Sequence, residues 1–305
     1  MIKKLLLFSL IVIFIPVIII TLFVKNDQIK FHFSSNSIIR VLRTDTNKID
    51  RVPIETYVTG VLAGEMPVEF DIEALKAQAV AARTYVMRQV QSSKNKDYDV
   101  VDTVLNQVYL DEEHLQSVWS ENYSSNINKI KTAVVETKGE YLSYNGQIVE
   151  ALFFSTSSGY TENSEEIFKN KVEYLRSVKS DWDKISKYYN YTVSFNRKEF
   201  FNLLNLNYSD KLNVEILSKT STGRPKEVKI NGVSLTAKEI CSKLKLRSTY
   251  FEIIDDNEKI IIKTKGYGHG VGMSQYGAEG MAREGYTYKE ILNYYYKGTE
   301  IKKFN

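Results

Sequence analysis

The sequence has few of the residues that build disulfide-bonded and metal-bound folds. Its 305 residues include one cysteine, Cys241, and three histidines, His32, His114 and His269. No internal disulfide is possible, and a cysteine-rich metal site is excluded. The histidines are not spaced as a zinc motif. The net charge is only +4, which gives no argument for nucleic-acid binding but suits contact with an anionic cell envelope.

One long uncharged run lies at the N-terminus. Residues 5–24 carry no charged side chain, and about 20 such residues are enough to cross a bilayer. Lys3 and Lys4 precede the run, so the positive-inside rule keeps the N-terminus in the cytoplasm. No small-residue cleavage pattern follows Val24. We therefore predict a retained signal anchor, a single-pass location in the cell membrane, and an extracytoplasmic catalytic domain.

Helical and strand-like segments follow one another in the rest of the chain, which predicts an α+β fold. Asn145-Gly146 and Asn231-Gly232 are typical hairpin turns between apolar runs. Thr287 and Glu290 form a capping-box pattern at the start of a C-terminal helix. The predicted regions are a transmembrane anchor (1–24), a linker with N-terminal strands (25–50), a helical catalytic region with antiparallel strands (51–180), a smaller inserted β-rich lobe (181–262), and a glycine-rich loop and helix that return to the catalytic region (263–305).

Two helices separated by a short break are predicted between residues 53 and 89. The first runs from Pro53, which suits the first helical position, to about Ala63, with Gly64 as its C-terminal stop. The second runs from about Ile72 to Gln89, with Asp71 as its N-cap. Glu65 stands in the break.

Glu65 is the first candidate for catalysis. It lies near the negative end of the preceding helix dipole, which should raise the pKa of its carboxyl group. A raised pKa is what a general acid needs at neutral pH. The alternative is an ordinary solvated surface glutamate.

Lys76 and Arg83 lie seven residues apart, so they share one face of the second helix at the border of its apolar stripe. They either point into a cleft or cover apolar surface with their long stems while their charged heads reach water.

A glycine-rich cluster, KGYGHGVGMSQYGA, occupies residues 265–278. Such density indicates a backbone that bends sharply or approaches a ligand closely. No Walker lysine follows, and the glycine order does not match a dinucleotide fingerprint. The cluster is either a packed strand–turn–helix around a buried His269 or a ligand-binding loop in which Ser274, Gln275 and Tyr276 supply hydrogen bonds.

Four ordered blocks of the chain together resemble the stage II sporulation protein D (SpoIID) family of lytic transglycosylases. They are EMPVEF…EALKAQAVAARTY at 65–85, DTVLNQVY at 102–109, AVVETKGEYLSYNGQIVEALFFSTSSGYT at 133–161 and GYGHGVGMSQYGA at 266–278. The resemblance extends from about Arg51 to the C-terminus.

The resemblance implies that Glu65 is the essential acid/base residue. It also implies a substrate groove lined by Lys76, Arg83, Gln107, Ser155, Ser157, His269 and Gln275. No cofactor is expected. Some family members carry cysteine and histidine around the 102–109 block and bind zinc there, but this chain has no cysteine in that block, so no metal is expected.

The reaction implied by the resemblance cuts the β-1,4 bond between N-acetylmuramic acid and N-acetylglucosamine in peptidoglycan that has lost its stem peptides. It leaves 1,6-anhydro ends, and the process served is forespore engulfment. The implied partners are glycan strands, a sporulation amidase and a membrane scaffold protein. Two alternatives remain open: a hydrolytic muramidase with Glu69 or Asp71 as second carboxylate, and a non-catalytic wall-binding scaffold that activates an amidase.

Overall fold

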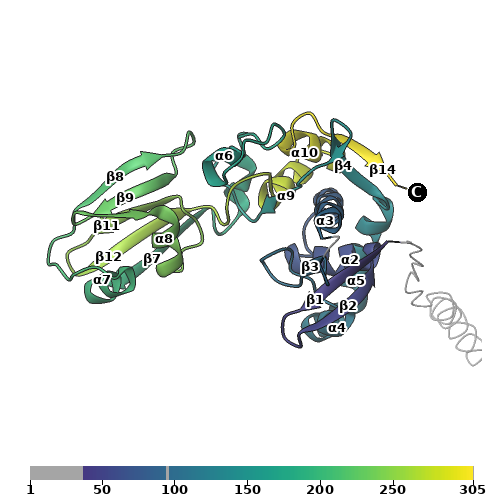
Figure 1. Ribbon diagram of the computed structural model, residues 1–305, viewed down its shortest axis with the longest axis horizontal. Helices are drawn as coiled ribbons and strands as arrows, with labels where there is room; N and C mark the ends of the chain where they lie inside the picture. Colours follow the sequence, from purple (N-terminus) through teal and green to yellow (C-terminus); the bar gives the residue numbers. More distant parts are fainter. Residues whose placement is uncertain (1–36, 94–95, 305) are drawn as a thin grey trace, which may run out of the picture.

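The computed structural model describes residues 37–93 and 96–304, which form the mixed helix and strand arrangement expected of an α+β fold (Figure 1). Their buried apolar side chains form two separate clusters. One joins residues between Ile39 and Tyr296, and the other joins residues between Phe200 and Ile262. Figure 1 shows the elements of the second cluster at the left, away from α2, α3 and α5.

The first cluster is built on two helices that follow a short sheet. Strand β1 (Ile38–Arg43) pairs with β2 (Lys48–Pro53) in antiparallel and with β3 (Val100–Val101) in parallel orientation. Helix α2 (Ile54–Glu65) and helix α3 (Ile72–Ser92) pack on each other and on α5 (Tyr123–Glu136). The Asp71 side chain accepts a hydrogen bond from the backbone of Glu73, which confirms the predicted N-cap. Smaller helices in this part are α4 (Glu112–Trp119), η1 (Ser120–Asn122), α6 (Ser164–Ile167) and η2 (Asp181–Ile185).

The C-terminal segment returns to this first cluster. Strand β4 (Glu140–Tyr144) pairs with β5 (Gln147–Ile148) through the predicted Asn145-Gly146 turn, and on its other side with β14 (Glu300–Lys303). Strand β6 (Phe153–Phe154) pairs in parallel with β13 (Met273–Ser274). Helices α9 (Gln275–Arg283) and α10 (Tyr288–Tyr295) then pack on α3, and α10 begins with the predicted capping box.

Two small antiparallel sheets and two helices form the second cluster. One sheet has the order β11 (Phe251–Asp255), β12 (Lys259–Lys265) and β7 (Asn190–Asn196), and the other has β10 (Val233–Thr236), β9 (Pro225–Ile230) and β8 (Val214–Lys219). Helices α7 (Arg197–Leu204) and α8 (Ala237–Lys243) contribute Phe200, Phe201 and Ile240 to the shared core. The Asn231-Gly232 turn joins β9 to β10, as predicted. Although η2 falls inside the predicted lobe 181–262, it packs on α9 and belongs to the first cluster.

The membrane anchor predicted over residues 1–24 lies outside the described residues. Within residues 37–93 and 96–304, no helix is both long and apolar enough to span a bilayer.

Candidate functional site

Glu65 is the last residue of α2, which extends two residues beyond the predicted helix end at Ala63. The prediction of Gly64 as the helix stop is wrong, because Gly64 is helical and its role is a tertiary contact. A Cβ on Gly64 would lie 2.7 Å from the backbone oxygen of Val108. The missing side chain therefore allows the 102–109 segment to approach the end of the helix that carries Glu65.

The carboxyl group of Glu65 is held on one side only. The backbone N–H of Val108 donates to its Oε1 at 2.6 Å. Among residues 37–93 and 96–304, nothing hydrogen-bonds to Oε2. Burial raises the pKa of Glu65, and the Val108 hydrogen bond opposes that shift only in part. The group thus combines a fixed orientation with an oxygen that remains available for proton transfer.

Gln107 lies next to this contact and is fully buried. Its Oε1 accepts a hydrogen bond from the Tyr57 hydroxyl at 3.2 Å, and Tyr57 stacks on Tyr109 with ring centroids 5.3 Å apart. Its Nε2 has no hydrogen-bond partner in the described part of the chain. Gln107 and the stacked rings therefore fix the segment that presents the Val108 N–H to Glu65.

Gln275 connects the glycine-rich cluster to the same place. Its Nε2 donates to the backbone oxygen of Glu65 at 3.0 Å. Ser274 caps the helix that starts at Gln275 by accepting from the Gly277 N–H. A carboxylate of that helix, Glu279, accepts a hydrogen bond from the Asp71 N–H at 2.6 Å. The end of α2, the start of α3 and helix α9 are thus joined around Glu65.

Tyr85 is a residue of this site that the sequence reasoning missed. The Val101 N–H donates to Oδ1 of Asn106, which orients the amide so that its Nδ2 donates to the Tyr85 hydroxyl at 3.1 Å. The Tyr85 proton is therefore available to another acceptor. Burial raises the pKa of Tyr85, and the charges of Glu150 and Glu65 add to the shift. Its position in the 65–85 block, two residues after Arg83, was the available signal.

The structure places Arg83 in the core and not on a groove surface. The side chains of Arg83 and Glu55 are 0% exposed, and Nη2 of Arg83 lies 2.6 Å from Oε2 of Glu55. The guanidinium also donates to the backbone oxygens of Val134 and Glu140. Arg83 therefore joins α2, α3 and α5, and its donors point at protein acceptors.

Lys76 also forms ion pairs within the protein. Its Nζ lies 2.7 Å from Oε1 of Glu73 and 2.6 Å from Oε2 of Glu136. It stands 5.9 Å from the ring centre of Tyr288. These contacts attach α3 to α5 and α10, and none of them involves Glu65.

Ser155 and Ser157 lie beside a buried carboxylate, Asp183, that no sequence pattern indicated. The backbone N–H and the hydroxyl of Ser157 donate to Asp183 at 2.7 and 2.8 Å, and the hydroxyls of Ser180 and Ser274 donate to it as well. Burial raises the pKa of Asp183, and these donors oppose the shift. The backbone N–H and the hydroxyl of Ser157 thus both bind Asp183 of η2, which packs on α9. Ser155 is half-buried, and its backbone oxygen accepts from the Tyr276 N–H.

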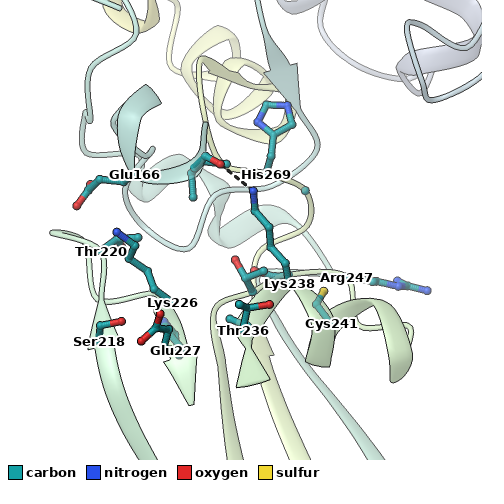
Figure 2. A pocket seen from close by; sticks show the side chains of 16 residues that line it. Glu166, Ser218, Thr220, Lys226, Glu227, Thr236, Lys238, Cys241, Arg247 and His269 are labelled. Atoms are coloured by element: carbon teal, nitrogen blue, oxygen red, sulfur yellow. Dashed lines mark hydrogen bonds between the residues drawn. The ribbon is translucent and has the colours of Figure 1, made fainter. Parts of the chain in front are cut away.

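His269 lies at a different cavity, of about 560 Å³, whose lining does not include Glu65 (Figure 2). Its Nε2 donates to the Phe153 oxygen at 3.1 Å, and its Nδ1 accepts from the Val271 N–H at 3.1 Å. The ring also lies 5.6 Å from the rings of Phe154 and Phe168. Burial lowers the pKa of His269 to about 4. Both nitrogens are engaged, as in the packed alternative for this residue.

The remaining candidate groups have other environments. Asp71 caps α3, and Glu69 is exposed to solvent. No group of three or more His, Cys, Asp or Glu side chains suited to a metal ion occurs in the described ranges 37–93 and 96–304.

Comparisons with known proteins identify the family of this chain. The family model for the stage II sporulation protein SpoIID matches residues 43–144, which contain Glu65 and Gln107. Stage II sporulation protein D of Bacillus subtilis (strain 168) is 43% identical over 270 residues, covering 87% of this chain and 79% of that protein. The protein of the same name from Bacillus amyloliquefaciens is 43% identical over 268 residues, covering 86% and 78%.

A more distant relative carries a different name. The amidase enhancer of Bacillus subtilis (strain 168) is 31% identical over 300 residues, covering 80% of this chain but 40% of that longer protein. The identity to the sporulation proteins extends over most of both chains, so the chain belongs to the SpoIID family of sporulation proteins.

Proposed function

We propose that this chain is a membrane-anchored peptidoglycan lytic transglycosylase that acts on denuded glycan during forespore engulfment. The observation that carries the proposal is the Glu65 carboxyl group, with one oxygen fixed by Val108, the other available, and its pKa raised by burial. A raised pKa increases the protonated fraction near neutral pH, which a general acid requires.

One such group is sufficient for this reaction. Glu65 donates its proton to the glycosidic oxygen as the bond to C1 of N-acetylmuramic acid breaks. The resulting carboxylate accepts the proton of the C6 hydroxyl, whose oxygen closes on C1 to give the 1,6-anhydro end. The proton returns to Glu65 and no water is consumed, so a second positioned carboxylate is not needed, unlike in hydrolases with two carboxylates.

The surroundings of Glu65 support this single-carboxylate reaction over a hydrolytic muramidase. Asp71 uses its Oδ1 as the cap of α3, and Glu69 faces solvent. In their place, the Tyr85 hydroxyl offers a neutral donor that can orient a sugar hydroxyl. We therefore assign substrate contacts first to Tyr85 and Gln275, and only then to Ser155 and His269, whereas the fully buried Gln107 positions the segment that carries the Val108 N–H.

The test is digestion of denuded glycan strands by the full-length chain and by its Glu65→Gln variant, with products identified by mass spectrometry. Anhydro ends, lighter by one water than reducing ends, are expected from the parent chain and not from the variant. Reducing ends would favour the muramidase. Equal cleavage by both proteins would refute the assignment of Glu65.

A second candidate function is supported by the relative named amidase enhancer. In this reading the chain binds glycan and activates a sporulation amidase, held together with it by a membrane scaffold protein. Amidase activity measured with the Glu65→Gln variant separates the two functions. Full stimulation by a variant that cleaves no glycan would show that activation does not depend on Glu65.

A further inference from the structure

An arginine without a carboxylate partner, Arg247, lies among three tyrosine rings. The guanidinium carbon of Arg247 is 4.1 Å from the ring centre of Tyr188, 4.8 Å from that of Tyr191 and 5.5 Å from that of Tyr267. We refer to these four residues as the Arg247 cluster. No Asp or Glu in the described part of the chain forms an ion pair with Arg247.

This lack of a partner distinguishes Arg247 from the other shielded arginines. Six others are buried or half-buried, and each forms an ion pair with an aspartate or glutamate: Arg40, Arg43, Arg83, Arg176, Arg197 and Arg224. Stacking on aromatic faces does not use the in-plane N–H donors of a guanidinium. The Tyr188 ring is inclined by 85° to that of Tyr267 and by 69° to that of Tyr191, so a guanidinium plane parallel to the Tyr188 ring is parallel to neither of the other two. No described residue accepts a hydrogen bond from the Arg247 side chain, and two N–H donors on one edge of a guanidinium form a fork that fits a carboxylate.

The cluster is accessible and its geometry is fixed by the backbone. Tyr191 is 37% and Tyr267 is 40% exposed. The Gly268 N–H donates to the Arg247 oxygen at 2.9 Å, and the Gly266 N–H donates to the Tyr188 oxygen at 3.1 Å. Figure 2 shows the Arg247 side chain extending away from the other labelled residues of the cavity. Exposed rings at fixed positions around a cation suit a ligand that is both a sugar and an anion.

We infer that the Arg247 cluster binds an N-acetylmuramic acid residue of denuded glycan, with the tyrosine rings against the sugar face and the guanidinium paired with the lactyl carboxylate. This inference rests on the proposed function. The lactyl group of N-acetylmuramic acid ends in a free carboxylate only after the stem peptide is removed, because the peptide converts it into an amide. The charge of Arg247 thus selects strands that have already been stripped.

The test uses ligands that differ only at this group, and the full-length chain with Glu65→Gln so that nothing is cleaved. The probes are a GlcNAc–MurNAc tetrasaccharide, the same sugar with its lactyl carboxyls converted to amides, and chitotetraose. A charge-assisted pair predicts that calorimetry will show binding of the carboxylate form roughly tenfold tighter than that of the amide form. Equal affinity of the two forms would overturn the inference without any further variant.

Variants locate the preference. Arg247→Gln should remove it while changing the affinity for chitotetraose less than about twofold, and Arg247→Lys, which keeps the charge but not the fork, should retain part of it. Lys259→Gln is the matched control, because it also removes one positive charge. Lys259 lies on β12, about 17 Å along the strand from Thr264, the residue that pairs with Tyr191 of the cluster. A preference unchanged by Arg247→Gln would refute the assignment.

Two further measurements complete the design. Tyr267→Ala should weaken all three sugar probes alike, since stacking does not read the lactyl group. Polyglycerol phosphate that binds more tightly than the muramyl probe would overturn the inference in favour of a phosphate-polymer site. The products formed by the parent chain, which keeps Glu65, are analysed in an independent experiment. If the parent forms anhydro ends but the binding assay shows no preference for the carboxylate probe, this inference is refuted and the proposed function still holds.

Discussion

The buried pair of Arg83 and Glu55 allows the structure and the family resemblance to be tested against each other. The resemblance implies that Arg83 lines the substrate groove, whereas the structure gives it no exposure. Replacing Arg83 with methionine, whose unbranched side chain follows the aliphatic part of arginine, removes the cation and keeps the apolar packing of that part. We expect the loss to be one of stability and not of substrate affinity.

The magnitude follows from what Glu55 retains. Without Arg83 it keeps the Gly139 N–H, at 3.0 Å from Oε1, and no cation. Removing one partner of a buried pair costs about 3–5 kcal/mol. At roughly 2–4 °C per kcal/mol for a domain of this size, the melting temperature should fall by about 10 °C.

The double variant Glu55→Gln with Arg83→Met is the informative control. Replacing both members of a buried pair by neutral groups is often nearly neutral, so at least half of the lost melting temperature should return. Thermal unfolding by circular dichroism at pH 7 measures stability, and calorimetry with the muramyl tetrasaccharide measures binding. An Arg83→Met variant that melts within about 2 °C of the parent but no longer binds the sugar would show that Arg83 acts in the groove.

Three further predictions concern Glu65, His269 and Gly64. Because the pKa of Glu65 is raised in the folded state, ionisation of this group at high pH opposes folding. Glu65→Gln should therefore unfold at a higher temperature than the parent at pH 8 and at the same temperature at pH 4, and a parent more stable than the variant at pH 8 would contradict the direction of the shift. Cleavage by the parent should decline as the pH rises through the Glu65 pKa. His269, with its pKa lowered to about 4, should show no ring titration by NMR between pH 5.5 and 8. Its contribution to stability should be lost as the pH falls from about 6.5 toward 4, because the unfolded chain binds the proton more readily in that range. An NMR titration midpoint near pH 6.5 would mean that the ring nitrogens do not form the hydrogen bonds described. Gly64→Ala should lower the cleavage rate by about tenfold or more, because the new Cβ displaces the Val108 backbone that orients Glu65. A folded Gly64→Ala variant that cleaves at the parent rate would contradict this role of Gly64.

The parts of the structure that follow from neighbouring residues were predictable from the sequence. Both Asn-Gly turns, the Asp71 cap and the Thr287 capping box depend on chemistry within four residues, and the structure has all of them. The α+β class followed from the same local patterns. Gly64 was misread because the feature that selects glycine there is a backbone segment more than 40 residues away, which no local pattern reveals.

Sequence patterns predicted the residues of the candidate site that lie within a motif block, but not the contacts that those residues make with distant segments. Glu65 and Gln275 lie in blocks that the sequence already singled out, and the structure joins them by a hydrogen bond. The partner of Arg83 is 28 positions away, and Asp183 collects donors from three separate segments. Whether a cation or carboxylate faces a ligand or the protein core depends on these distant partners.

The hydrogen bond between Gln275 and Glu65 spans 210 positions of the chain, and the one between Tyr288 and Glu73 spans 215. A ribosome makes the α2 end long before it makes α9 and α10. A nascent chain therefore carries Glu65 without the helices that hold it, and the arrangement around the carboxyl group is completed only when almost the whole polypeptide has been synthesised. Chains that end before α9 are therefore expected to lack the ordered surroundings of Glu65, even when α2 and α3 have already formed.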